Sequence, residues 1–192
     1  MNIREFSQNL LILYEEMGTT FSSYQKSTEL HCLSGCGFCC TNPEVEASVL
    51  EMLPMALKIW DENTWESWLR KLEHSNTHCL IYEAHSPDLK KGRCGSYKER
   101  PSICRIFGVA GRLDKNQNLQ LSVCKYIKEA NPELVQEKKE QAKKEETPIM
   151  ADWMHKLSQL DPQLTAQKMP INQALKIAIE KVALYASYSE NF

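Results

Sequence analysis

The chain has 192 residues, of which 42% are hydrophobic and 25% are charged, and its formal net charge is −2. These values are typical of a globular protein of one domain, here residues 1–192, whose core is large enough to fold without disulfide bonds. The small net charge argues against a protein that binds nucleic acid through phosphate attraction, and no run of about 18 apolar residues predicts a membrane span.

The chain up to residue 75 carries three helical patterns. Apolar residues at intervals of three or four predict one amphipathic helix over residues 3–28. The run Ser48–Glu51 has the sequence of a capping box and predicts the start of a second helix, although Pro54 favours a start nearer Leu53. A third helix is predicted over residues 61–75, where apolar side chains share one face.

The rest of the chain is irregular at first and helical later. Residues 76–124 contain four cysteines and little helical period, and a polar turn at 114–118 between apolar runs predicts a small β-hairpin. Residues 125–146 are rich in Lys and Glu and predict a solvated helix, and residues 171–185 predict a terminal amphipathic helix. We therefore expect a mainly α fold in which helices surround an irregular cysteine-rich metal-binding centre with a small β-hairpin.

Eight cysteines are the most informative feature of the sequence. Four of them lie within nine residues and four follow later in the chain: the first are Cys32, Cys36, Cys39 and Cys40, and the later ones are Cys79, Cys94, Cys104 and Cys124. The N-terminus shows no secretory signal, so we expect a cytoplasmic protein, in which thiols stay reduced and metal binding is favoured over disulfide bonds. Thiolate ligands restrict the metal to zinc, iron or copper(I).

Several arrangements of these thiolates stay open. Cys39 and Cys40 are adjacent, so their side chains tend to diverge, and we expect Cys40 to bind a second metal or to form a bridge. Eight thiolates would fit two tetrahedral zinc sites, two cubane clusters or one shared binuclear site. Cys79 stands alone in an apolar context and could instead be a buried apolar residue, and His31 or His78, each next to a cysteine, could replace a ligand.

The sequence contains no motif that identifies a catalytic residue. The spacing C-x3-C-x2-C also occurs in radical SAM enzymes, but there it follows the first strand of a barrel, whereas here it follows a predicted helix. A phosphate-binding glycine loop, an H-E-x-x-H motif and a G-x-S-x-G motif are all absent. A role as a component of an oxidoreductase stays open.

A second motif makes the cysteine pattern specific. The cluster C-x3-C-x2-C-C, the later Cys79 and the run CGSYKERPSICR, which ends at Arg105, together resemble the YkgJ-type cysteine-cluster family. The resemblance covers residues 31–125, and Cys124 matches a late cysteine that is common in the family. Two features depart from the family pattern: the first gap has three residues instead of two, and Ser96 stands where the family has an aliphatic residue.

The resemblance implies a metal-binding core over residues 31–125, flanked by helical segments 1–30 and 126–192. The metal ligands would be the eight cysteines, Cys32, Cys36, Cys39, Cys40, Cys79, Cys94, Cys104 and Cys124. The family is described as zinc- or iron-chelating or as containing Fe–S clusters, which implies iron, as a [4Fe–4S]-type cluster with a redox or electron-transfer role. Zinc in the four-cysteine sites of a structural or interaction protein is the alternative. The expected partners are the metal ion and a redox or other protein, with no nucleic acid and no membrane.

Other residues of the second motif would lie around such a centre. A centre ligated only by thiolates is anionic, so Arg100 and Arg105 would offset its charge from close by and would tune a potential. The alternative is that either arginine pairs with Glu99 or with another surface carboxylate. Pro101 is expected to start a short helix that carries Cys104, and Tyr97 is expected in the core.

Overall fold

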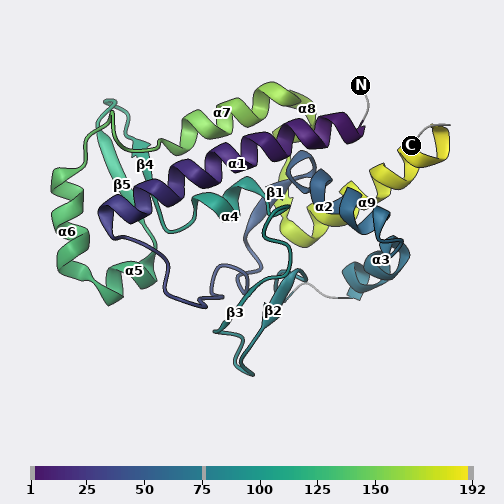
Figure 1. Ribbon diagram of the computed structural model, residues 1–192, viewed down its shortest axis with the longest axis horizontal. Helices are drawn as coiled ribbons and strands as arrows, with labels where there is room; N and C mark the ends of the chain where they lie inside the picture. Colours follow the sequence, from purple (N-terminus) through teal and green to yellow (C-terminus); the bar gives the residue numbers. More distant parts are fainter. Residues whose placement is uncertain (1–2, 75–76, 190–192) are drawn as a thin grey trace.

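Helices make up most of the structure, a computed structural model that describes residues 3–74 and 77–189 (Figure 1). They are α1 (Ile3–Thr28), α2 (Val49–Asp61), α3 (Trp65–His74), α4 (Ser102–Ile106), α5 (Lys125–Ala130), α6 (Pro132–Gln141), α7 (Met150–Leu160), α8 (Pro162–Ala166) and α9 (Ile171–Tyr188). The mainly α fold is thus confirmed. Within these described ranges, no helix is both long and apolar enough to cross a membrane.

The strands in the described part of the chain are short and pair as antiparallel two-stranded sheets. The pairs are β1 (Glu46–Ser48) with β6 (Lys168–Pro170), β2 (Tyr82–Ala84) with β3 (Gly92–Cys94), and β4 (Val109–Leu113) with β5 (Leu119–Val123). The β4–β5 pair is the hairpin that the polar turn predicts. The β1–β6 pair joins residues far apart in the sequence, and the helices that follow these strands, α2 and α9, pack against each other.

The largest apolar core lies where α1, α2 and α9 meet, in the right half of Figure 1. Small residues allow the close approach of α2 and α9, since Ala56, Ala174 and Ala178 have no exposed surface. Tyr14 of α1 and Leu50 of α2 fill the space between these helices. Burying each large apolar side chain contributes about 1.5–3 kcal/mol, which makes this core the main source of stability.

Helix α1 also extends beyond this core and connects it to two smaller ones. Met17 and Phe21 pack with Trp153 of α7, and Tyr24 packs with Val109 of β4. Figure 1 shows α1 crossing the molecule with α7 on one side and α4 on the other. The predicted helix over residues 3–28 is confirmed over its whole length. Buried side chains recur along it, so successive turns pack against the rest of the protein.

The capping box at the start of α2 is confirmed as well. The Ser48 hydroxyl accepts a hydrogen bond from the Glu51 N–H at 3.3 Å, and the Glu51 carboxylate accepts one from the Ser48 N–H at 2.8 Å. The expectation of a start nearer Leu53 was wrong, since α2 begins at Val49 and contains Pro54. The cap satisfies N–H groups of the first turn and fixes the start of the helix at Val49, ahead of the proline.

The expectation of one helix over residues 125–146 was wrong. The chain forms α5, breaks at Asn131, and starts α6 at Pro132, whose fixed φ suits the first helical position. Helix α6 then ends at Gln141. The third predicted helix is observed as α3, which begins at Trp65, and its expected last residue, 75, lies outside the described residues.

We expect the Glu51→Ala variant to be less stable by about 2–4 kcal/mol. The carboxylate is fully buried and accepts hydrogen bonds from the Ser48 N–H and hydroxyl and from the Ser102 hydroxyl, so its removal leaves buried donors without an acceptor. Urea denaturation would measure the change. The control is Glu66→Ala, which removes an exposed carboxylate 3.9 Å from Arg70 and should cost less than about 1 kcal/mol. Equal midpoints for the two variants would contradict the role given to Glu51.

Candidate metal centre

The first four cysteines lie on a loop of tight turns between α1 and β1. Gly35 adopts a φ of 69°, in the left-handed region that glycine tolerates best, and the Cys36 N–H then bonds to the Leu33 carbonyl at 3.0 Å. The next turn is closed by the Cys40 N–H, which donates to the Gly37 carbonyl at 2.9 Å. These turns place Cys36 and Cys39 on the wall of one cavity.

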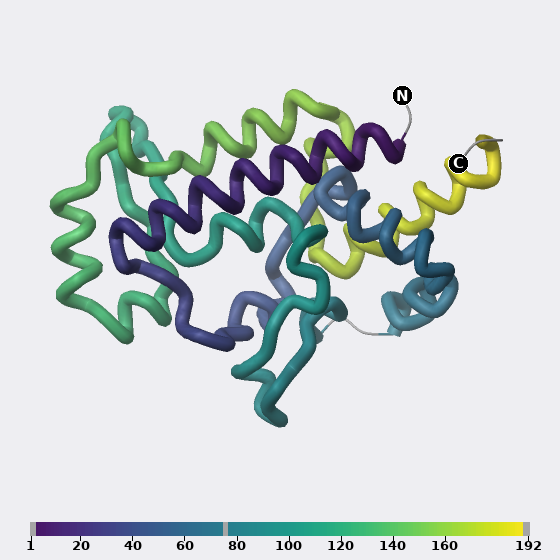
Figure 2. The backbone as a smooth tube through the Cα atoms, viewed as in Figure 1, coloured from purple at the N-terminus to yellow at the C-terminus, as the bar shows by residue number. Residues whose placement is uncertain are grey.

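Backbone hydrogen bonds fasten this loop to the β2–β3 hairpin. The Gly92 N–H donates to the Gly35 carbonyl at 2.9 Å, and the Gly37 N–H donates to the Lys90 carbonyl at 3.1 Å. The Cys79 N–H donates to the Cys40 carbonyl at 2.9 Å. Figure 2 shows the loop running from the end of α1 along one side of the molecule to the hairpin. The hairpin thereby brings the later cysteines to the first group.

The Tyr82 ring packs between two glycines where loop and hairpin meet. A β-carbon added at Gly37 or at Gly92 would overlap this ring. The Tyr82 hydroxyl donates a hydrogen bond to the Leu89 carbonyl at 2.9 Å, which holds the ring in place. Glycine at these two positions is therefore required by close packing and not by a special φ.

Of the four later cysteines, Cys79 lies in the segment before β2, and the other three lie in or next to different elements. Cys94 ends β3, directly opposite Tyr82 of β2, and Cys104 lies in α4, which follows Pro101 as expected. Cys124 follows β5, and its N–H donates to the Gly108 carbonyl at 2.7 Å. The β4–β5 hairpin therefore connects Cys104 to Cys124 and returns the chain to the same region.

Four cysteines line one cavity of about 440 Å³: Cys32, Cys36, Cys39 and Cys124. Aromatic side chains form part of its wall, since the rings of Phe38 and Tyr126 stack 3.8 Å apart at 14°. The Cys39 and Cys40 sulfurs lie 4.0 Å apart. As the side chains stand, no three His, Cys, Asp or Glu residues within 3–74 and 77–189 are gathered tightly enough to hold a single metal ion.

Burial and neighbouring groups shift the pKa values of these thiols in opposite directions. The pKa of Cys39 is lowered to about 7, chiefly by the hydrogen bond from the Cys40 thiol and also by the charge of Arg100. Burial raises the pKa of Cys79 to about 11. Burial also raises the pKa of Cys104, and the charge of the neighbouring Cys79 adds to that shift. A metal that binds here must displace protons from most of the thiols, so its affinity rises with pH.

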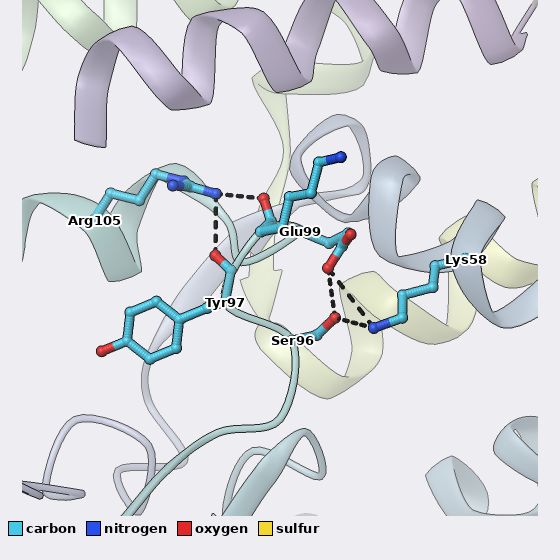
Figure 3. A network of polar contacts seen from close by, with 6 residues as sticks. Lys58, Ser96, Tyr97, Glu99 and Arg105 are labelled. Atoms are coloured by element: carbon cyan, nitrogen blue, oxygen red, sulfur yellow. Dashed lines mark hydrogen bonds and ion pairs between the residues drawn. The ribbon is translucent and has the colours of Figure 1, made fainter. Parts of the chain in front are cut away.

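Arg105 orders the loop that precedes α4 (Figure 3). Its guanidinium donates to the carbonyls of Arg100 at 3.0 Å, Lys98 at 2.5 Å and Tyr97 at 3.3 Å. It also lies over the Tyr14 ring, 4.7 Å from the centroid. Arg105 therefore does not pair with Glu99, the alternative considered from the sequence, because its guanidinium N–H groups donate to these backbone carbonyls.

Glu99 has other partners. It accepts a hydrogen bond from the Ser96 hydroxyl at 2.5 Å and lies 3.9 Å from the Lys58 ammonium (Figure 3). Lys58 in turn donates to the Ser96 hydroxyl at 2.8 Å. Ser96 is buried, and its hydroxyl has hydrogen-bond partners in this polar triad. A serine can therefore stand where the family has an aliphatic residue, and the triad links the loop to α2.

Arg100 carries a buried donor that lacks an acceptor. Its Nε is buried and is without a hydrogen-bond partner in the described part of the chain. The guanidinium stacks on the Tyr97 ring, 4.1 Å from the centroid, and Tyr97 itself is 61% exposed, so the expectation of a core tyrosine was wrong. Burial raises the pKa of both Cys94 and Cys104, and the charge of Arg100 partly opposes that shift. The positive charge of Arg100 therefore acts on these thiols.

The two histidines next to cysteines have their own surroundings. His31 is exposed. The His78 ring lies 2.9 Å from the Thr77 hydroxyl, and the His78 carbonyl accepts a hydrogen bond from Asn172 at 2.7 Å. Their possible role as ligands stays a prediction.

Comparison with known proteins agrees with this constellation. Residues 31–150 match the model of the CxxCxxCC family, described as a "Putative zinc- or iron-chelating domain". The chain belongs to this family. The match confirms the resemblance that the cysteine pattern indicates, and it extends past residue 125 through α5 and α6 to residue 150.

Part of the chain is also similar to a protein of a methanogenic archaeon. An uncharacterized protein of Methanocaldococcus jannaschii is 31% identical over 93 residues, which are 45% of this chain and 48% of that protein. The chain therefore spans about half the length of the curated relative that it matches. No solved structure matches the chain.

We expect Gly37→Ala to displace the cysteine loop of this CxxCxxCC protein. The added methyl group would overlap the Tyr82 ring, and such overpacking costs about 1–3 kcal/mol. Metal content after purification and the midpoint of thermal unfolding would both fall. The control, Gly18→Ala in α1, meets only Arg105 at 3.4 Å and should retain both values. Adding Tyr82→Ala should restore the metal content of the Gly37→Ala variant, and wild-type behaviour of Gly37→Ala alone would contradict the prediction.

Proposed function

We propose that the protein binds iron through its cysteines, as an Fe–S cluster of the [4Fe–4S] type, and acts in electron transfer or redox sensing. The observation that carries this proposal is the cavity of about 440 Å³ lined by four cysteines, because a polynuclear cluster needs a space between its ligands. The eight cysteines are the ligands that would hold iron. When bound, the cluster would supply reversible one-electron chemistry.

The arginines support a buried anionic centre. A cluster held by four thiolates carries net negative charge, and hydrogen bonds and positive groups around it set its reduction potential. The charge of Arg100 favours the ionised form of Cys39, Cys94 and Cys104. Within the described residues its buried Nε has no hydrogen-bond partner. Arg105 holds the Arg100 carbonyl and thereby positions this residue.

One observation favours zinc as the alternative. In a tetrahedral site with Zn–S bonds of about 2.3 Å, two sulfurs lie about 3.8 Å apart. The sulfurs of Cys39 and Cys40 are 4.0 Å apart, close to that value. The protein would then be a structural or interaction module whose four-cysteine zinc sites stabilise the loops.

Metal and sulfide analysis of protein purified without oxygen distinguishes these functions. We expect a brown preparation with iron and acid-labile sulfide in comparable amounts. A colourless preparation with stoichiometric zinc and no sulfide would overturn the iron proposal and support the zinc alternative. A protein that binds neither metal, even after reconstitution under reducing conditions, would exclude both.

In the iron-loaded protein, we expect Arg100→Gln to lower the reduction potential. Loss of one positive charge near the cluster destabilises the more negative, reduced state, by on the order of 50 mV. A redox titration followed by electron paramagnetic resonance would measure the shift. Arg70→Gln, on the exposed face of α3, is the matched control and should leave the potential unchanged. An equal potential in both variants would mean that Arg100 does not act on the centre.

A further inference from the structure

We propose that the eight cysteines form two separate four-sulfur metal sites that differ in how readily they exchange metal. The outer site consists of Cys32, Cys36, Cys39 and Cys124, and it exchanges metal with the solution. The inner site consists of Cys40, Cys79, Cys94 and Cys104, and it retains its metal as part of the folded structure. This division rests on the proposed function, since it requires that the cysteines bind metal.

The outer set is defined by a common cavity. All four of its cysteines line the same space of about 440 Å³, and Cys32 is exposed. The stacked rings of Phe38 and Tyr126 join the two walls of this cavity, because Phe38 lies between Cys36 and Cys39 and Tyr126 follows Cys124. This contact holds α5 against the cysteine loop.

The inner set is defined by a common surface of the large core. Cys79, Cys94 and Cys104 come from separate segments, yet all three pack against the core formed by α1, α2 and α9. Cys124 packs instead against the smaller core that contains Val109. Of the four later cysteines, three therefore pack against the large core and one packs against the smaller core.

Backbone contacts attach Cys40 to this inner set. Its carbonyl accepts the Cys79 N–H at 2.9 Å, and the Cys79 carbonyl accepts the Tyr82 N–H at 3.1 Å, which leads to Cys94 opposite Tyr82.

The boundary between the two sites runs between the adjacent cysteines. Cys39 lines the outer cavity, whereas Cys40 is not among its lining residues. The Cys39 and Cys40 sulfurs lie 4.0 Å apart, so the two proposed sites are neighbours and one CC pair can supply a ligand to each of them. The two adjacent cysteines at the end of the CxxCxxCC motif would thus each bind a different metal.

The surroundings of the two sites differ in ways that affect release. The outer site opens toward solvent at Cys32, so a chelator can reach it. In the inner site Cys104 lies in α4, whose Ser102 hydroxyl bonds to the buried Glu51, and Cys94 lies in the hairpin fastened to the cysteine loop. Removing the inner metal would therefore release three segments from one another.

Chelator-induced release from the metal-loaded 192-residue chain tests this division. We expect two phases of equal amplitude when the remaining bound metal is measured over time. Half of the metal should leave at least tenfold faster than the rest, with no change in circular dichroism, and the slow half should leave together with the loss of helical signal. Release in one phase, with all metal equivalent, would overturn the proposal.

Single substitutions assign the phases to the sites. Cys124→Ser should lose the fast half and keep the slow half, and Tyr126→Ala, which removes no sulfur, should accelerate only the fast phase. The matched variant Cys94→Ser should lose the slow half. Since Cys94→Ser could fail to fold, Cys124→Ser is decisive: loss of all metal, or of none, would overturn the division. A wild-type protein that binds no metal would instead refute the proposed function itself.

Discussion

The carboxylate of Glu51 is buried where three helices meet, and the position of the cysteine-rich region depends on it. It accepts hydrogen bonds from the capping residue Ser48 at the start of α2 and from Ser102 at the start of α4. Tyr14 of α1 donates to the Glu51 carbonyl at 2.9 Å. A buried carboxylate is stable only when such donors surround it, so these contacts hold α4, with Cys104 in it, in one place on the core.

The cysteine segments depend on this scaffold because they have little apolar surface of their own. The loop at residues 31–43 and the β2–β3 hairpin are joined by a few backbone hydrogen bonds and by the Tyr82 ring. In such a region, bound metal replaces the hydrophobic core as the source of cohesion. The proposed inner site would connect three segments to the main core, and the proposed outer site would leave a reactive centre near the surface.

Prediction from the sequence succeeded where the signal was local. The α1 helix, the Ser48 cap and the hairpin at residues 114–118 all follow from periodicity or from turn residues within one segment. The break at Asn131 and Pro132 carried a local signal too, an Asn-Pro pair that could have been read as a turn. The β1–β6 pair had no local signal in the sequence, because these three-residue strands come together only when α2 and α9 pack against each other.

The sequence by itself determined the chemistry of the site: eight thiols, their family and the arginines beside them. The tertiary structure alone decided how these groups are distributed, because that depends on which core each segment packs against. Cys39 and Cys40 are neighbours in the chain, yet only Cys39 lines the cavity shared with Cys124, 84 positions after Cys40. The exposure of Tyr97, and the lack of a partner for the buried Arg100 Nε among the described residues, likewise follow from the path of the loop that Arg105 holds. Spacing along a chain specifies which ligands exist, whereas the packing of distant segments specifies which of them can share a metal.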